Sequence, residues 1–167
     1  MRAESLTSPI TPSWAYLLRH PRALLAFGFG SGLSPIMPGT CGTLAAVPFF
    51  LLLAQLPIYA YLAVVVLAFV VGIHLCGKTA QEMELEDPGG IVWDEFVGLW
   101  IALIGAPAGW HWLVLGFVLF RVFDMLKPWP ISLADKHLKG GFGIMFDDVL
   151  AGIAAWACLQ GVVLWLG

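Results

Sequence analysis

The charged residues of this chain gather in three intervals and leave three long stretches without any charge. No Asp, Glu, Lys or Arg occurs at residues 23–77, 96–120 or 149–167. About 20 consecutive apolar residues span a bilayer, so each stretch is close to that length or exceeds it. The composition agrees, because 60% of the 167 residues are hydrophobic, 11% are charged, and the mean hydropathy is +0.89. These values predict an integral membrane protein.

Helix-breaking residues divide the two longer stretches. Pro57 would separate two helices in the first. In the second, residues 105–109 (GAPAG) would reverse the chain; a single tilted helix is the alternative, but it would place these breakers near the bilayer centre. We therefore predict an all-α fold, a compact helical membrane protein with a Gly/Pro-rich re-entrant loop near the N-terminus. Its apolar helices, about five, would lie at residues 43–56, 58–77, 91–105, 110–126 and 148–166.

The positions of the charges predict the topology. Five crossings would place every Lys and Arg on one side of the membrane, and the positive-inside rule assigns that side to the cytoplasm. Residues 1–22 would form a cytoplasmic N-terminal arm, and residues 23–167 would form a single membrane domain. The same topology brings acidic residues of separate segments to one membrane face. A shared site therefore becomes possible, with the candidates Asp94, Glu95, Asp124, Asp147 and Asp148.

Two adjacent carboxylate pairs border apolar segments, namely Asp94 with Glu95 and Asp147 with Asp148. Capping and the helix dipole favour acidic residues at helix N-termini, which would explain either pair alone. Acidic groups beside membrane spans are nevertheless functional by default. Mg²⁺ prefers oxygen ligands and takes one or two carboxylates together with substrate phosphate. We predict that these four residues and Asp124 act as metal ligands or catalytic groups, and the sequence leaves the division of roles open.

Arg121, Asp124 and Lys127 follow one another at steps of three along a predicted helix end. Side chains at this spacing can lean toward one neighbourhood. Arg offers a phosphate a bidentate fork and Lys offers a point charge, so we expect both to bind substrate phosphate. The alternative is structural, with an ion pair between Arg121 and Asp124 and a Lys127 side chain that reaches to the interface.

A segment rich in Gly and Pro, residues 28–43 (GFGSGLSPIMPGTCGT), leads into the first predicted helix. Exposed backbone N–H groups at glycines and at a helix N-terminus bind anions, and hydroxyl groups add further donors. The segment is equally well interpreted as a phosphate cradle or as a re-entrant turn that only reverses the chain. The candidate phosphate-binding residues are Ser31, Ser34, Gly39, Thr40 and Thr43.

Residues 72–79 (GIHLCGKT) match the Walker A pattern of nucleotide-binding loops letter for letter. A true P-loop follows a strand and lies in a soluble parallel sheet, whereas a long apolar run precedes this match. We therefore expect no nucleotide to bind there. Nucleic acid is not expected as a partner either, because the net charge is −3 and the eight basic residues form no dense block.

Four segments, in order along the chain, resemble the bacterial phosphatidylglycerophosphatase A family. They are residues 28–43, 91–100 (IVWDEFVGLW), 120–131 (FRVFDMLKPWPI) and 140–152 (GGFGIMFDDVLAG). The resemblance implies a Mg²⁺-dependent, multi-pass phosphatase of the bacterial inner membrane with its active site facing the cytoplasm. The implied reaction hydrolyses phosphatidylglycerophosphate to phosphatidylglycerol and inorganic phosphate, so this lipid and the bilayer would be its partners. By motif position, the resemblance implies that the same five carboxylates are metal or catalytic ligands.

Two rival functions stay open on sequence grounds. An enzyme of the same kind would act on a different lipid phosphate, such as a polyprenyl or phosphatidate headgroup. A small transporter or channel would instead use intramembrane carboxylates to conduct ions. Carboxylates deep in a span would favour transport, whereas carboxylates gathered with Arg and Gly-rich backbone at one interface favour phosphate chemistry.

Overall fold

The computed structural model describes residues 12–86 and 88–166, and all regular secondary structure in these residues is helical. The prediction of an all-α fold is therefore confirmed. Residues 1–11 of the predicted arm lie outside the described residues. The elements follow in the order α1 (Trp14–Arg19), α2 (Pro21–Ala26), the 3-10 helix η1 (Gly28–Leu33), α3 (Pro38–Leu53), α4 (Ile58–Glu82), α5 (Trp93–Ala102), α6 (Trp110–Leu126), α7 (Ile131–His137) and α8 (Gly140–Leu166).

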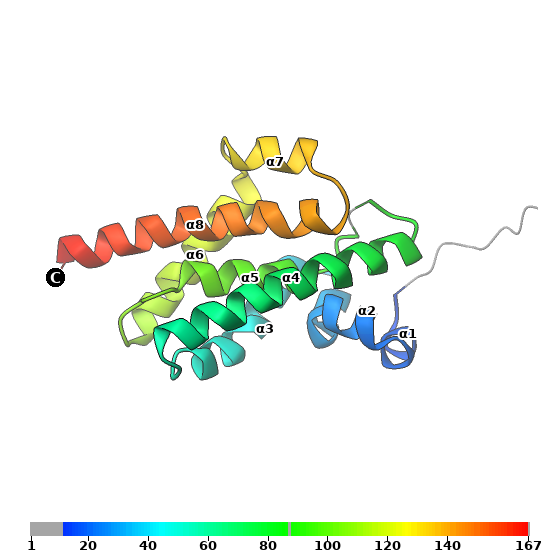
Figure 1. Ribbon diagram of the computed structural model, residues 1–167, viewed down its shortest axis with the longest axis horizontal. Coiled ribbons are helices and arrows are strands. Elements are labelled where there is room, and N and C mark those ends of the chain that lie inside the picture. The colour runs from blue at the N-terminus through cyan, green and yellow to red at the C-terminus, as the bar shows by residue number, and fades with distance from the viewer. Residues whose placement is uncertain (1–11, 87, 167) are drawn as a thin grey trace, which may run out of the picture.

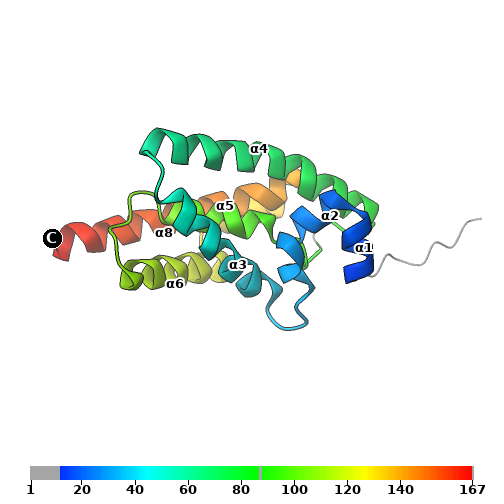
Figure 2. The same cartoon turned by 90° about the horizontal axis from the view of Figure 1, so that it is seen from below.

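Helix α8 is the centre of the fold. Helices α4, α5, α6 and α7 all pack against it. The views in Figures 1 and 2 show α4 and α6 on opposite sides of α5 and α8, and α3 lies against α5. Helices α1 and α2 cover the end of the molecule opposite the C-terminus, where α2 packs on α4. This arrangement encloses the short helix α5 on several sides.

Helix α5 is buried because it is apolar all round beyond its first turn. The side chains of Phe96, Val97 and Leu99 have no exposed surface. Its two tryptophans satisfy their indole N–H groups on neighbouring helices. Trp93 Nε1 donates to Ala68 O of α4 over 3.0 Å, and Trp100 Nε1 donates to Ala46 O of α3 over 3.2 Å. These bonds fix the position of α5, and with it the position of its first turn.

Glycines let the backbone of α8 approach two other helices. A Cβ atom on Gly141 would lie 1.9 Å from Ile73 O in α4, and one on Gly152 would lie 2.5 Å from Gly98 O in α5. Contacts this short exclude any side chain larger than hydrogen at both positions. Residues 140–152 are thus a stretch of helix that packs by main-chain contact.

The five predicted apolar helices all occur, but their boundaries and roles differ from the prediction. Helix α8 begins at Gly140 and not near residue 148, because its Gly-rich start packs as helix against α4. Among the residues that the structure describes, α4 and α8 alone are both long enough and apolar enough to span a bilayer, by length and composition. The prediction of about five membrane-spanning helices is therefore wrong: α5 has ten residues, most of them buried within the protein, and α3 has sixteen.

Candidate active site

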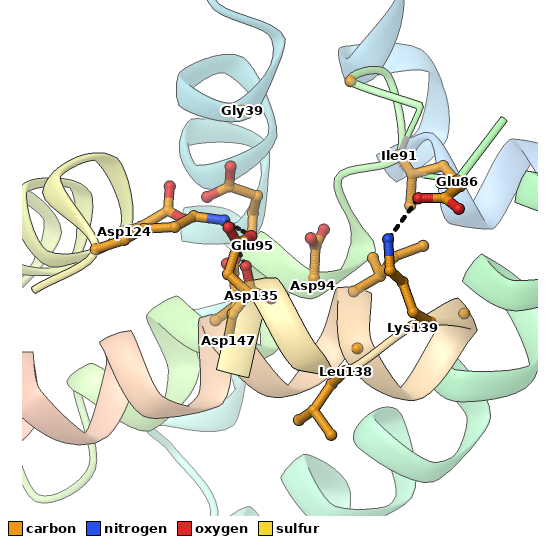
Figure 3. Close-up of a pocket in the computed structure, with 16 residues that line it drawn as sticks. Gly39, Glu86, Ile91, Asp94, Glu95, Asp124, Asp135, Leu138, Lys139 and Asp147 are labelled. Carbon is orange, nitrogen blue, oxygen red and sulfur yellow. Dashed lines mark hydrogen bonds and ion pairs between the residues drawn. The ribbon is translucent and has the colours of Figure 1, made fainter. Parts of the chain in front are cut away.

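One cavity of about 270 Å³ collects most of the charged side chains from the interior of the fold (Figure 3). It opens where α5 and α8 begin, between the end of α6 and the α7–α8 connection. The charged side chains that line it are Glu86, Asp94, Glu95, Asp124, Lys127, Asp135, Lys139, Asp147 and Asp148. All five carboxylates predicted from the sequence are among them, so the structure brings these residues together from three helices.

Helices α5 and α8 supply four of these carboxylates. Asp94 and Glu95 stand in the first turn of α5, as the sequence predicts. Asp147 and Asp148 lie two turns inside α8 and not at its start, because α8 begins eight residues earlier than expected. A role as N-terminal helix caps therefore does not explain this pair. Glu95, Asp147 and Asp148 are buried, with 7%, 7% and 3% of their surfaces exposed.

Arg121 joins α6 to α5 through carboxylates. Its Nη1 donates to Glu95 Oε2 and, over 2.8 Å, to Asp124 Oδ2 one turn away on α6. The Thr43 hydroxyl of α3 donates to the same Glu95 oxygen over 2.8 Å. The structural alternative for Arg121, an ion pair with Asp124, is therefore present, and it extends to a second helix. Arg121 is not among the residues that line the cavity.

Lys127 ends α6 in a left-handed conformation, with φ 43°, and turns its side chain into the cavity. Its Nζ lies 2.5 Å from Asp135 Oδ1 of α7 and 2.6 Å from Asp147 Oδ2 of α8. Burial alone would lower the pKa of this ammonium group, but the hydrogen bonds to Asp135 and Asp147 outweigh burial and raise it. Lys127 therefore carries its positive charge at neutral pH.

The sequence prediction missed three charged residues of the cavity. Asp135 contacts Lys127, and Lys139 donates to Glu86 Oε2 over 2.6 Å, an exposed pair visible in Figure 3. The hydrogen bond from Lys139 lowers the pKa of Glu86. A signal was available, since Asp135 and Lys139 share the charged interval between α6 and α8 with Lys127. Their convergence with Glu86 required the chain path through α7.

Several carboxylate oxygens in the cavity lack partners. Asp94 Oδ1, Asp147 Oδ1 and Asp148 Oδ2 are buried and accept no hydrogen bond. Burial, followed by the charge of Glu95, raises the pKa of Asp94 well above its usual range. Burial, followed by the charge of Asp124, raises the pKa of Glu95 to about 7. The cavity thus holds more carboxylate than its cations neutralise, and a bound cation would relieve this excess.

These oxygens have the chemistry that a hard cation requires, because Mg²⁺ takes oxygen ligands almost exclusively. In residues 12–86 and 88–166, no three His, Cys, Asp or Glu side chains are already gathered as a metal cluster. Asp94, Asp147 and Asp148 nevertheless fit Mg²⁺, because each has an unpartnered carboxylate oxygen in this cavity.

The predicted phosphate-binding segment contributes to the cavity mainly through the start of α3. Gly39 lines the cavity, and a Cβ atom there would lie 2.2 Å from Glu95 Oε1. The hydroxyl of Thr40 is buried without a partner. Ser31 Oγ donates to Gly28 O and Ser34 Oγ to Ile36 O, and neither serine lines the cavity.

The Walker-like segment is part of helix α4 and forms no loop. A Cβ atom on Gly72 would lie 2.6 Å from the Met145 side chain, and one on Gly77 would lie 3.1 Å from Gly141 of α8. Thr79 is fully buried. These residues pack α4 against its neighbours, and their geometry is not that of a nucleotide-binding loop.

Comparison with known proteins gives a consistent family. The family model for phosphatidylglycerophosphatase A matches residues 24–163. A protein of Escherichia coli named phosphatidylglycerophosphatase A is 49% identical over 151 residues, which cover 90% of this chain and 86% of the relative. A protein of Haemophilus influenzae with the same name is 46% identical, covering 89% and 93%.

A third relative carries a different name. This Bacteroides thetaiotaomicron protein is 42% identical over 151 residues, which cover 86% of this chain and 93% of the relative, and its name proposes phosphatidylinositol-3-phosphatase activity. No solved structure matches the chain. The matched region 24–163 contains every residue of the cavity described above. On the family model and the two relatives of that name, the chain belongs to the phosphatidylglycerophosphatase A family.

Proposed function

We propose that this chain is a Mg²⁺-dependent phosphatase that hydrolyses phosphatidylglycerophosphate to phosphatidylglycerol and inorganic phosphate. The observation that carries the proposal is the cavity in which unpartnered carboxylate oxygens lie beside the charged Lys127. The names of the Escherichia coli and Haemophilus influenzae relatives support the substrate. A channel is less well supported, because the carboxylates are gathered with cations at one end of α8 and not spaced along it.

Asp94, Asp147 and Asp148 would hold the Mg²⁺ through their unpartnered oxygens. When bound, the ion supplies positive charge to the phosphate oxygens and to the charge that develops during hydrolysis. Buried carboxylates suit this role, because too few positive charges lie near them and a bound cation would stabilise their negative charge. The fold holds them in place through α5 and α8.

Lys127 and Lys139 both line the cavity, and Lys127 is the better placed to contact the phosphate because its side chain is 29% exposed, against 67% for Lys139. An ammonium group gives a phosphate oxygen a strong charge-assisted hydrogen bond. Arg121 acts differently: it holds Glu95 and Asp124 in position from outside the cavity lining. A carboxylate of the cavity would accept the proton of the attacking water, since carboxyl groups with raised pKa values are suited to general base catalysis near neutral pH.

The proposed location is the cytoplasmic side of the bacterial inner membrane. Helices α4 and α8 are the candidate spans. Large apolar side chains are exposed on several helices, including Val66 and Leu67 on α4, Val118 on α6 and Leu164 on α8, and exposed apolar surface on this scale is typical of contact with lipid or with another protein. All charges of α8 lie in its first nine residues, so the cavity would lie at the membrane interface.

The test is phosphate release by the full chain purified in detergent. The substrates are phosphatidylglycerophosphate, phosphatidate and phosphatidylinositol 3-phosphate, each with Mg²⁺ or with EDTA. We expect Mg²⁺-dependent release chiefly from the first. Release chiefly from phosphatidylinositol 3-phosphate would replace the substrate with the one that the Bacteroides relative's name suggests. No release from any of the three would contradict the proposal of a lipid phosphatase.

A further inference from the structure

A second hollow lies next to the charged cavity and has the opposite chemistry. This groove, of about 540 Å³, runs between α7 and the first half of α8. Its volume is within the range of pockets that bind small ligands, roughly 300–1,000 Å³. We call it the α7–α8 groove, and it is lined by Pro130, Leu133, Ala134, His137, Leu138, Phe146 and Leu150.

The α7–α8 groove is apolar along its length. His137 is the one polar side chain among its lining residues, and its Nδ1 is engaged with Leu133 O over 2.9 Å. Leu133 lines the groove and is 49% exposed, so part of the apolar wall is uncovered. The occupant that such a surface favours is a hydrocarbon, because burial of apolar surface away from water is favourable.

The groove adjoins the charged cavity. Leu138 lines both hollows. In each of the two helices, neighbouring residues face different hollows. In α7, Ala134 lines the groove and Asp135 the cavity; in α8, Phe146 lines the groove and Asp147 the cavity. A molecule with an anionic group at Lys127 and a hydrocarbon chain attached could therefore occupy both at once.

The geometry points to the α7–α8 groove as the binding site for an acyl chain of the lipid whose phosphate occupies the charged cavity. This inference rests on the proposed function. It makes α7 a part of substrate binding, with Asp135 on one side of the helix against Lys127 and apolar residues on the other against the chain. The exposed apolar face of α4 is a poorer candidate, because none of the residues of that helix lines the charged cavity.

Ala134→Trp tests the inference by filling the groove. The measured quantity is kcat/KM for phosphatidylglycerophosphate with long acyl chains, divided by kcat/KM for its dibutanoyl form, both in the same detergent. We expect the ratio to fall about tenfold, the effect of withdrawing roughly two methylene groups from an apolar site. The matched control is Ala157→Trp, an exposed alanine of α8 outside the groove, which should leave the ratio unchanged.

The outcomes separate the groove from the proposed function. A wild-type chain that releases phosphate from neither form would overturn the proposed function and the inference with it. A wild-type chain that is active, with the same ratio in Ala134→Trp, would overturn the groove alone. Equal losses with both forms in a folded Ala134→Trp variant would also overturn it, since they would indicate a general disturbance of the site.

A second measurement does not depend on turnover or on the folding of a variant. Phosphatidylglycerophosphate with a diazirine near the end of one acyl chain is bound to the wild-type chain in EDTA, irradiated, and the labelled peptides are identified. We expect label on residues 130–150, displaced by unlabelled substrate. Label spread evenly over the exposed apolar faces of α4 and α6 would mean that only bulk lipid fills the groove, and absence of label from residues 130–150 would mean that another occupant, such as a second copy of the chain, covers it. Either result would overturn the inference.

Discussion

The ammonium nitrogen of Lys127 lies 2.6 Å from Asp147 Oδ2 and ties the end of α6 to α8, two turns beyond the start of that helix. Asp147 is buried, and its other carboxylate oxygen has no partner. The ion pair is thus the one side-chain hydrogen bond that the structure gives Asp147, and the cation would be shared with a substrate phosphate. This sharing makes Lys127 a residue whose loss affects both folding and activity.

Replacement of Lys127 by Met should lower activity strongly and should destabilise the fold by about 2 kcal/mol, between the values for exposed and buried ion pairs. The control is Lys78→Met, because Lys78 is exposed and its Nζ lies 3.4 Å from Gln81 Oε1. Thermal unfolding and phosphate release would be measured on both. A Lys127→Met variant with normal turnover would remove Lys127 from the phosphate site.

Asp148→Asn should abolish most of the activity, by at least about a hundredfold, while the melting temperature stays the same or rises. Asp148 is buried, and one of its oxygens has no partner, so loss of the charge relieves repulsion among the carboxylates. Glu84→Gln is the matched control, since Glu84 is exposed and does not line the cavity. If the variant melts much lower than the wild type, the carboxylate has a structural role that its surroundings do not indicate.

Thr43→Val tests whether Thr43 positions Glu95. The substitution keeps the shape of the side chain but removes the hydroxyl group that donates to Glu95 Oε2. We expect kcat to fall about tenfold with little change in KM, and Thr43→Ser to restore most of the activity. An increased KM with unchanged kcat would instead favour the sequence prediction that Thr43 contacts the phosphate.

Gly141→Ala should separate α4 from α8, because its Cβ atom would lie 1.9 Å from Ile73 O. The main chain on both sides would have to move, and we expect a loss of about 2–4 kcal/mol in the free energy of unfolding. Gly161→Ala is the control on the same helix. A Cβ atom there meets nothing within 4 Å, so this variant should be as stable as the wild type or slightly more stable.

The stability of the metal-free protein should depend on pH through the buried carboxylates. Folding raises the pKa of Glu95 from 4.5 to about 7 and raises that of Asp94 as well. The native state therefore binds more protons than the unfolded state between these pKa values, and stability is lost as the pH rises through about 5 to 7. Thermal unfolding in EDTA should show this fall, and Mg²⁺ should reduce it. Parallel pH profiles with and without Mg²⁺ would contradict a metal site at these residues.

The sequence predicts the helical fold and the composition of the cavity well. Charge-free stretches bounded by Pro and Gly locate the helices, and the confinement of charges to a few intervals predicts that Asp94, Asp124 and Asp148 lie near one another. These signals are strong because an unpaired charge is costly beside lipid or in a core. The same reasoning cannot distinguish burial in lipid from burial in protein. Helix α5 was therefore predicted to span the membrane, whereas α3, α4 and α8 enclose it.

The remaining errors have tertiary causes. Asp135 contacts Lys127 only because α7 folds back along α8, and nothing in its local sequence indicates this path. Helix α8 begins at Gly140, two turns before the predicted start at residue 148, and Gly141 lets this added part of the helix pack closely on α4. The hydroxyl groups of Ser31 and Ser34 donate to the nearby carbonyl groups of Gly28 and Ile36, and their predicted role in anion binding stays a prediction.

The crossing of α5 and α8 at Gly98 and Gly152 has a consequence for ion selectivity. The two glycines lie three and four residues beyond Glu95 and Asp148, so main-chain contact sets how closely the acidic ends of the helices approach. A spacing held by close main-chain contact would favour a small ion. Mg²⁺ is small and demands near-ideal octahedral geometry, whereas Ca²⁺ takes more ligands at longer distances. If the proposed function is correct, two residues that have no side chains would therefore favour the smaller ion.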